Sequence, residues 1–250
     1  MAGLIWLEDS TPLPAPIYAS PEGLLAAGAS LTLERLTEAY TNGIFPWFNP
    51  GDPVLWWSPD PRMLLACADF KISRSLAKKL RQIARIEQQP DARMYITTDT
   101  AFAEVIAACA APRDGRPDTW ISPQMQAAYL AWHHAGVAHS VETWMDGELV
   151  GGIYGVNLGG FFFGESMFSR RSNASKIALA YLVRFLLTRG VQHIDCQQET
   201  SHLASLGAAP VSRRRFMAVL GSALKTPAAP WPCGRLLHTG SLARGWPITP

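Results

Sequence analysis

The sequence predicts a mixed α/β (α+β) protein in which a small N-terminal domain precedes a larger domain built on a helix-covered sheet. Three strand-like runs follow one another at residues 139–145, 149–157 and 160–168. An apolar helical stretch then leads to Gly190 and to a short strand-like run, VQHIDCQ. Successive strands, a buried helix and a returning strand are typical of a sheet with helices on its faces.

The predicted small domain covers residues 1–62. It is irregular and rich in Pro and Trp, and it contains one helix that Thr32 opens, with apolar residues at helical spacing. The stretch 43–62, GIFPWFNPGDPVLWWSPDPR, cannot be a long helix because five prolines interrupt it. Its many Trp and Phe residues indicate a rigid surface that packs on a neighbouring domain or contacts a ligand.

The predicted larger domain covers residues 63–250. Helices are expected from Ser73 onward, over 100–110 and over 123–136. The side chain of Ser172 or Asn173 is expected to cap the next, apolar helix, which ends at Gly190 in a left-handed conformation. The tail after Thr226 is rich in Pro and is expected to wrap loosely around the domain.

Composition narrows the function classes. The 250 residues are 48% hydrophobic and 17% charged, and the net charge of +2 means that any nucleic-acid surface must be local. No apolar run approaches the ~20 residues that span a bilayer, and the first residues do not resemble a signal peptide. The four cysteines lack metal-ligand spacing, which favours reduced thiols in a cytosolic protein and predicts no metal site.

Glu165 interrupts an apolar run in the stretch 161–176, FFFGESMFSRRSNASK. On a regular strand Phe161, Phe163, Glu165 and Met167 share one face, unless a bulge at Gly164 shifts that parity. The carboxylate then marks either an apolar pocket with one anionic corner or a structural ion pair with an arginine. The pocket would suit an apolar group beside a cation.

A second carboxylate, Asp195, lies in the run IDCQ. Strand alternation places Asp195 and Gln197 on one face and Cys196 on the other. A carboxylate beside an amide can orient and polarise an amine or a water molecule. The alternative is an aspartate that caps the following loop.

Two basic segments are candidates for contact with phosphate. At the start of the apolar helix, Arg170, Arg171 and Lys176 favour a phosphate-bearing ligand over ordinary capping. A helix beginning near Ser73 has a basic face with spacings of four, three and four, formed by Arg74, Lys78, Arg81 and Arg85. Such a face is commonly only solvated, but the tryptophans of the stretch 43–62 make a surface for nucleic acid a second interpretation.

Together these segments resemble the leucyl/phenylalanyl-tRNA–protein transferases over roughly residues 23–216. The matching motifs occur in order and are GLLAAG (23–28), YTNGIFPWF (40–48), LWWSPDPR (55–62), TWI (119–121), AHSVE (138–142), LVGGIYGV (149–156), FFGESMFSR (162–170), NASK (173–176), IDCQ (194–197) and SLGA (205–208). So many linked motifs are far more specific than any single pattern.

The resemblance implies a larger domain similar in fold to the Gcn5-related N-acetyltransferases. It implies an enzyme that moves Leu, Phe or, less well, Met from aminoacyl-tRNA to the α-amine of proteins beginning with Arg or Lys. That product is marked for N-end-rule degradation. We accordingly expect a cytoplasmic monomer that uses no cofactor or metal and does not contact membranes.

The resemblance also assigns residues. Asp195 and Gln197 match positions implicated in catalysis, Glu165 lines the same site, and Trp47 is expected to stack on the terminal adenosine. The other expected substrate contacts are Trp120, Ile153, Phe162, Gly164, Met167, Ser169 and Leu182, of which Ile153, Phe162, Met167 and Leu182 would line the aminoacyl side-chain pocket. The residues matching the tRNA-contacting helix are Arg74, Lys78 and Arg81. The family often has Met or Phe where Ile153 and Leu182 stand, and Gln82 replaces a frequent basic residue.

Two other functions share some of these sequence features. A CoA-dependent N-acetyltransferase needs a glycine-containing pyrophosphate loop before the apolar helix, and residues 170–175, RRSNAS, contain no glycine. A non-catalytic tRNA-binding module would explain the basic helix and the aromatic residues. It would give no reason for IDCQ and GESMFS to converge.

Overall fold

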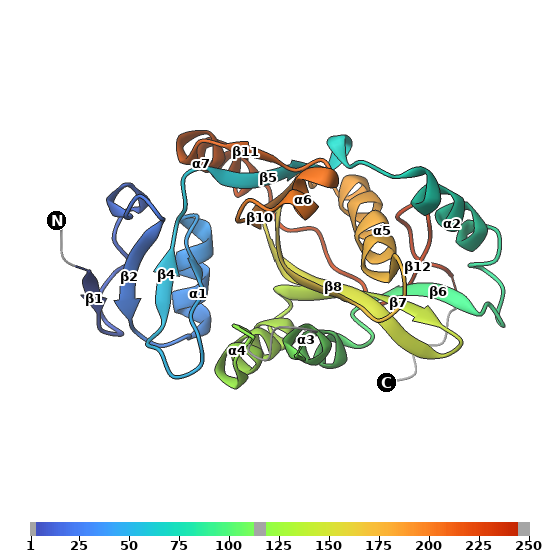
Figure 1. The fold of residues 1–250 in the computed structure, drawn as a ribbon, viewed down its shortest axis with the longest axis horizontal. Coiled ribbons are helices and arrows are strands. Elements are labelled where there is room, and N and C mark those ends of the chain that lie inside the picture. The colour runs from blue at the N-terminus through green and yellow to red at the C-terminus, as the bar shows by residue number, and fades with distance from the viewer. Residues whose placement is uncertain (1–3, 113–118, 245–250) are drawn as a thin grey trace.

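The computed structural model describes residues 4–112 and 119–244 and contains two sheets (Figure 1). The smaller sheet has the strand order β1-β2-β4-β3, with bounds Ile5–Leu7, Leu24–Gly28, Leu55–Trp57 and Phe45–Pro46. The larger sheet has the order β11-β5-β10-β9-β8-β7-β6-β12. Its bounds in that order are Ala209–Val211, Arg62–Ala66, His193–Gln197, Phe161–Ser169, Glu148–Leu158, Ala138–Met145, Met94–Thr98 and Gly234–Leu236. The predicted mixed α/β class is confirmed.

Helices cover both faces of the larger sheet (Figure 1). One face carries α3 (Phe102–Ala110) and α4 (Pro123–His134), and the other carries α5 (Ala174–Thr188), against which α2 (Arg74–Ala84) packs. The remaining elements are α1, α6, α7, η1 and η2, with bounds Leu33–Thr41, Ser201–Ser205, Arg213–Ala223, Pro16–Tyr18 and Cys67–Asp69. The hydrophobic core under α3 and α4 continues into the core of the small sheet. The ring of Tyr40 on α1 joins the two, because it makes edge contacts with Trp132 and Phe163 at centroid distances of 5.1 and 5.0 Å.

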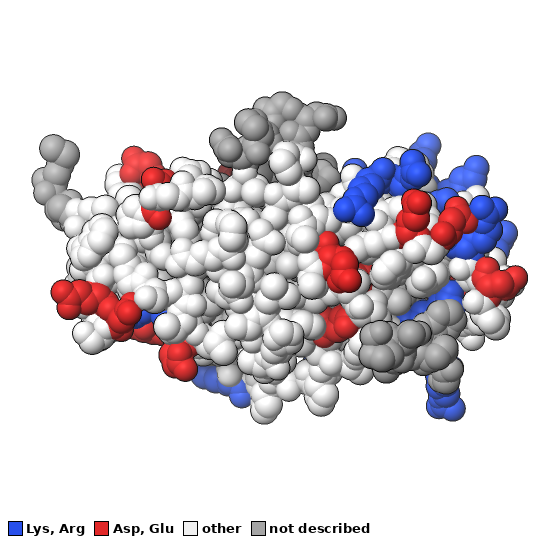
Figure 2. Space-filling model, turned by 90° about the horizontal axis from the view of Figure 1, so that it is seen from below, with Lys and Arg blue, Asp and Glu red and all other residues white. Residues whose placement is uncertain are grey.

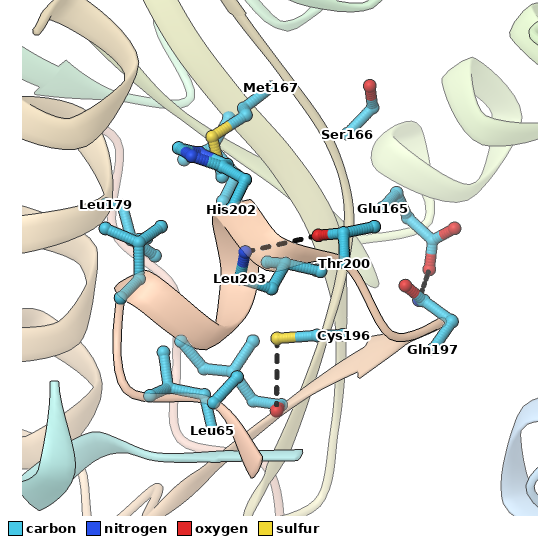
Figure 3. Close-up of a pocket in the computed structure, with 15 residues that line it drawn as sticks. Leu65, Glu165, Ser166, Met167, Leu179, Cys196, Gln197, Thr200, His202 and Leu203 are labelled. Atoms are coloured by element: carbon cyan, nitrogen blue, oxygen red, sulfur yellow. Dashed lines mark hydrogen bonds between the residues drawn. The ribbon is translucent and has the colours of Figure 1, made fainter. Parts of the chain in front are cut away.

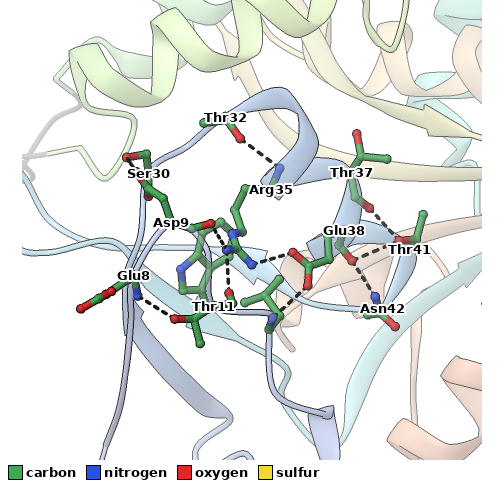
Figure 4. A network of polar contacts seen from close by, with 12 residues as sticks. Glu8, Asp9, Thr11, Ser30, Thr32, Arg35, Thr37, Glu38, Thr41 and Asn42 are labelled. Atoms are coloured by element: carbon green, nitrogen blue, oxygen red, sulfur yellow. Dashed lines mark hydrogen bonds and ion pairs between the residues drawn. The ribbon is translucent and has the colours of Figure 1, made fainter.

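A buried arginine fastens the N-terminal segment to α1 (Figure 4). Arg35 Nη1 donates to Glu38 Oε2 at 2.6 Å, and Nη2 donates to the carbonyl oxygens of Asp9 and Thr11 at 2.9 and 2.7 Å. Glu38 Oε1 accepts from the backbone N–H of Leu13 at 2.8 Å. Charge-assisted bonds of this kind satisfy both a buried guanidinium and an otherwise irregular backbone. Residues 8–13 therefore have a fixed course although they form no helix or strand.

Most predicted helix ends agree with the structure. Thr32 caps α1 and Ser73 caps α2, each accepting from a backbone N–H three residues on, and Gly190 is left-handed with φ 75°. The predicted side-chain cap of α5 is wrong. Asn173 is the N-cap residue, but it is itself left-handed (φ 66°) and its side chain caps nothing. Instead, the hydroxyl of Ser169, at the end of β9, accepts from the N–H of Ser175 at 3.3 Å.

The expectation of a loose tail is also wrong in part. Residues Gly234–Leu236 form β12, which pairs antiparallel with β6 and closes one edge of the larger sheet. Trp231, just before this strand, stacks on His139 at 4.2 Å and donates its indole N–H to Thr98. A single tryptophan and a three-residue strand thus fix a segment whose composition suggests a loop.

Charged side chains are unevenly distributed over the face that Figure 2 shows, seen from below relative to Figure 1. Lys and Arg gather at the right-hand end, the end at which Figure 1 draws α2, whereas the charged side chains of the left half are mainly Asp and Glu. Helix α2 buries Leu76, Leu80 and Ile83 and exposes Arg74, Lys78 and Arg81. The predicted amphipathic basic helix is therefore present.

Gly155 on β8 provides a test of strand packing. A Cβ there would lie 2.2 Å from the carbonyl oxygen of Phe163 and 2.5 Å from the ring of Phe162, so the paired strands would have to separate. We expect Gly155→Ala to lower the free energy of unfolding by about 3 kcal/mol or more, measured by urea denaturation. Gly221→Ala, in α7 with open space around it, should instead stabilise by about 0.5–1 kcal/mol. Equal effects at the two positions would contradict this packing argument.

Candidate active site

The site forms where two parallel strands of the larger sheet separate. Strands β9 and β10 are in register only at Phe162 with Ile194 and at Phe163 with Asp195. Beyond these pairs, Gly164 and the residues after it on β9 line one wall of a cavity, and Cys196 and Gln197 on β10 line another. Strand ends of this kind are common ligand sites in α/β sheets.

Two cavities adjoin at this point. The first, which we call the apolar cavity, has a volume of about 300 Å³ and is lined mainly by apolar groups, including Leu65, Ile153, Met167, Leu179, Ile194, Leu206 and Ala208. The second, the aromatic cavity, has a volume of about 250 Å³ and includes Phe45, Pro46, Trp47 and Trp120. The two cavities share Glu165, Cys196, Gln197, Thr200 and Leu203. Any ligand that spans both must pass these shared side chains.

Figure 3 shows the polar corner of the apolar cavity, where the side chains of Glu165 and Gln197 point toward each other. Gln197 Nε2 donates to Glu165 Oε1 at 3.4 Å, a long hydrogen bond. The thiol of Cys196 lies on the apolar side, and its pKa is raised by burial, so it remains protonated. The corner thus offers one carboxyl group and one amide to a ligand in an otherwise apolar space.

Asp195 lies behind this corner and is fully buried. Its two carboxylate oxygens accept from Arg62 Nε and Nη2 at 2.9 and 2.6 Å, a bidentate ion pair with a 1% exposed arginine. The Arg62 guanidinium also stacks on Phe45 and Phe216, each 4.6 Å from the ring centroid, and donates to the carbonyl oxygen of Gly43 at 3.2 Å. Asp195 lines neither of the two cavities.

The predicted alternation along IDCQ is wrong because the strand has a bulge. The register of β10 against β5 shifts between Asp195 and Gln197, and Gln197 adopts φ 55°. As a result Cys196 and Gln197 both line the cavities while Asp195 is directed elsewhere. Asp195 Oδ1 accepts from the N–H of Gln197 at 2.9 Å and so stabilises this left-handed residue.

A second bulge shifts the parity of β9. Tyr154 pairs with Ser166 whereas Gly155 pairs with Gly164, so Glu165 is the extra residue. Phe161 and Phe163 belong to the core under α3 and α4, as alternation predicts. Met167 instead packs with the core around α5. The shift in alternation that Gly164 indicated is therefore present. Because of it, Glu165 and Met167 do not share one face of the strand as regular alternation would require.

The Glu165 carboxyl group is half-buried at the cavity wall but lies in an environment that disfavours its ionised form. Tyr129 donates to Oε2 at 3.0 Å, and the hydroxyl groups of Tyr40 and Tyr129 are 2.5 Å apart. Burial raises the pKa of Glu165 to about 8, with the charge of Asp195 adding to the rise and the tyrosine hydroxyls and Arg62 opposing it. The carboxyl group is therefore largely protonated at neutral pH when nothing cationic is bound.

The other predicted contacts fall into three groups. Trp47 and Trp120 line the aromatic cavity, and Trp57 supports Trp47 by donating its indole N–H to the Trp47 carbonyl oxygen at 2.6 Å. Ile153, Gly164 and Met167 line the apolar cavity, and Ser169 lines a neighbouring one. Phe162 and Leu182 line none of these cavities and lie in the core around α5.

Several residues at the site had no predicted role. Tyr40 and Arg62 lie within the motifs YTNGIFPWF and LWWSPDPR, which carry the family resemblance. The motifs mark these residues as candidates but do not indicate which side chains they contact. Tyr129 lies in none of those motifs. Further cavity residues from the segment after β10 are Thr200, His202, Leu203, Leu206 and Ala208.

One described group of side chains has metal-ligand geometry, namely Asp99, His133 and His139, whose potential ligand atoms lie within 4.8 Å of one another. Their hydrogen bonds are already those of a structural cluster. His139 Nδ1 is 2.7 Å from Asp99 Oδ2, and His133 Nδ1 is 2.8 Å from the carbonyl oxygen of Ala138. None of the three lines the cavities described above.

Over the described ranges, no helix combines the length and apolarity needed to cross a bilayer.

Comparison with known proteins gives the family. The family model "Leucyl/phenylalanyl-tRNA protein transferase" matches residues 64–221, and the model of its N-terminal domain matches residues 29–60. A leucyl/phenylalanyl-tRNA–protein transferase from Bordetella petrii is 62% identical over 241 residues, covering 96% of this chain and 95% of the relative. One from Bordetella avium is 58% identical over 239 residues, covering 95% and 96%.

Among solved structures, a GCN5-related N-acetyltransferase from Kribbella flavida aligns with a TM-score of 0.35 and 12% identity, over 70% of this chain and 60% of that chain. The sequence matches, with a site that joins an apolar and an aromatic cavity, define the protein as an aminoacyltransferase enzyme that works with tRNA. The chain belongs to the leucyl/phenylalanyl-tRNA–protein transferase family.

The raised pKa of Glu165 predicts how stability depends on pH. The folded state holds this proton more tightly than the unfolded state, whose glutamate pKa is near 4.5. The contribution of Glu165 to the free energy of unfolding is therefore fully present below about pH 4.5. It is lost as the pH rises toward about 8, the pKa of Glu165 in the folded protein. Glu165→Gln should remove this loss, which urea unfolding of both proteins between pH 5 and 8.5 would measure. An identical pH slope in the two proteins would show that Glu165 ionises normally.

Proposed function

We propose that the protein transfers Leu, Phe and, less well, Met from aminoacyl-tRNA to the N-terminal α-amine of proteins that begin with Arg or Lys. The observation that carries this proposal is the junction of the two cavities at Glu165 and Gln197. A Leu, Phe or Met side chain, a nucleoside and a cation each find a chemically matched surface within one connected space. The product would be marked for N-end-rule degradation.

In this proposal the donor spans both cavities. The terminal adenosine stacks on Trp47 in the aromatic cavity, where base–aromatic stacking contributes roughly 1–3 kcal/mol. The aminoacyl side chain enters the apolar cavity beside Ile153 and Met167. An apolar cavity discriminates weakly among Leu, Phe and Met, because they differ there mainly in size and shape. The ester carbonyl then lies near the side chains that the two cavities share.

The acceptor would place its cationic side chain against Glu165. Asp195 is unsuited to that role because Arg62 already neutralises it and protein covers it completely. Glu165, in contrast, faces both cavities and is largely protonated in the free protein. A bound Arg or Lys side chain would favour the ionised form, so acceptor binding would release a proton from Glu165.

The chemical step is aminolysis of an activated ester. The acceptor nitrogen attacks the carbonyl carbon, an amide C–N bond forms, the ester C–O bond breaks, and the terminal ribose hydroxyl of the tRNA departs with the proton that the amine gives up. A free α-amine has a pKa near ~8, so a neutral fraction is present at physiological pH. Orientation of the two reactants can then provide several kcal/mol, up to about 10.

Gln197 is the group that would hold the attacking amine, through its side-chain oxygen, and Asp195 would act through it. The Asp195 carboxylate fixes the left-handed backbone of Gln197 and hence the direction of the amide. This arrangement supports a positioning role for Asp195 rather than direct proton transfer.

The exposed cations of α2, namely Arg74, Lys78 and Arg81, would contact the tRNA backbone as a phosphate-tracking surface. We further propose that the protein acts as a monomer in the cytoplasm.

A substrate matrix tests the function directly. The protein is incubated with tRNA charged with Leu, Phe, Met or Ile and with peptides that begin with Arg, Lys or Ala, and the products are identified by mass. We expect addition of Leu and Phe, weaker addition of Met and none of Ile, on the Arg and Lys peptides only. Equal transfer to the Ala peptide, or transfer from acetyl-CoA, would refute the proposal.

The role of Glu165 is tested with a neutral isostere of the acceptor. Lysine and norleucine have similar shapes, so the ratio of kcat/KM for Lys- and norleucine-initiated peptides isolates the charge. Glu165→Gln should reduce this ratio about tenfold or more, chiefly through acceptor KM, while the KM for Phe-tRNA stays within twofold.

Gln197→Ala is the matched comparison for Glu165→Gln, because Gln197 donates the hydrogen bond that Glu165 accepts. It should lower kcat for both peptides and leave their ratio nearly unchanged, because it removes orientation rather than charge recognition. If Glu165→Gln left the lysine preference intact, the acceptor charge would have to be recognised elsewhere.

A further inference from the structure

A third cavity, of about 400 Å³, continues the row of cavities along β9. It shares Met167 and His202 with the apolar cavity and shares no residue with the aromatic cavity. The order along the strand is therefore aromatic cavity, apolar cavity, third cavity. In Figure 3 Met167 and His202 lie together at the rim, well away from Glu165 and Gln197.

The spacing along β9 fits a polypeptide. A strand rises about 3.3 Å per residue, so Met167 lies at most about 7 Å and Ser169 at most about 13 Å beyond Glu165, because the bulge at Glu165 shortens the first step. An extended acceptor chain advances by the same amount per residue. With its α-amine beside Glu165 and Gln197, its third residue reaches Met167 and its fourth and fifth residues reach the third cavity.

The donor already occupies the other two cavities in the proposed complex. In that complex the adenosine occupies the aromatic cavity and the aminoacyl side chain occupies the interior of the apolar cavity, which leaves the rim at Met167 and His202 for the acceptor. The acceptor is continued by a whole protein, so its chain has to leave the reaction centre along a surface that the donor does not cover. The third cavity opens from the rim of the apolar cavity at Met167 and His202, and it provides such a path.

The third cavity is polar on one side and positively charged. Ser175 in the first turn of α5 lines it and is 9% exposed, and its hydroxyl makes no hydrogen bond to any residue in the described ranges. Arg170 lines it as well and is held by a bond from Nη1 to the carbonyl oxygen of Leu149 at 3.0 Å. The positive end of α5 adds to this field, and none of the described residues lining the cavity is acidic.

We propose that the third cavity binds residues three to five of the acceptor polypeptide and discriminates among them by charge, favouring acidic over basic side chains. This inference rests on the proposed function and extends it from the first acceptor residue to those that follow. The Ser175 hydroxyl, which bonds no residue in the described ranges, would bond the acceptor backbone or an acidic side chain, and Arg170 would supply the charge preference.

The test uses peptide amides that all begin with Arg-Ala. Extension of Arg-Ala to Arg-Ala-Ala-Ala-Ala should lower acceptor KM, and further extension should change it little. At low ionic strength, Arg-Ala-Asp-Asp-Ala should exceed Arg-Ala-Lys-Lys-Ala in kcat/KM by about tenfold, and added salt should shrink that ratio. Arg170→Ser should reduce it to about threefold or less.

Arg214→Ser is the matched control, because it removes the same charge from an exposed position on α7. It should leave both the ratio and the length dependence unchanged. Equal KM values for the two- and five-residue peptides, or an unchanged ratio in Arg170→Ser, would overturn the proposal. A raised KM for charged tRNA in Arg170→Ser, with the peptide ratio intact, would assign the cavity to RNA instead. Absence of transfer to every Arg peptide would refute the proposed function itself, so the two failures are distinguishable.

Discussion

The geometry of the site depends on one buried ion pair, between Arg62 and Asp195. The pair is bidentate, both side chains are almost completely covered, and two aromatic rings enclose the guanidinium. Loss of either partner would leave an uncompensated buried charge, which typically costs 3–5 kcal/mol. The same carboxylate also holds the backbone of Gln197. The ion pair therefore fixes Asp195, and Asp195 in turn orients Gln197 at the cavity.

Two bulges create the space in which chemistry can occur. Regular pairing of β9 with β10 would bring Glu165 and Gln197 into the sheet, and the cavity would be filled by backbone hydrogen bonds. Instead, one extra residue on each strand turns a polar side chain toward the gap. Bulges are frequent beside active sites for this reason. The cost of exposing strand ends is limited here because neighbouring strands β5 and β8 keep both strands paired on their outer sides.

Sequence reasoning predicted α2, α3, α4 and the run from β7 to β10 in order, because apolar periodicity and capping residues are local signals. It did not predict the shorter elements β5, β6, α6, β11 and β12, or helix α7. It placed Glu165 and Gln197 at the site from motifs. It failed where a local rule was overridden by a distant partner. Alternation predicted that Asp195 and Gln197 share a face, but the bulge that separates them is stabilised by Arg62, 133 residues away. The tyrosines around Glu165 come from α1 and α4, and no local pattern indicates that two helices so far apart in sequence converge on one carboxyl group.

The enclosure of Arg62 by Phe45 and Phe216 bears on how the protein is made. Synthesis proceeds from the N-terminus, so the first 200 residues are translated before α7, which spans Arg213–Ala223. Until then the guanidinium lacks one of its two aromatic covers, and the strand that carries Asp195 has only recently been translated. The cover over the ion pair that holds the backbone of Gln197 is therefore complete only after Phe216 has been translated.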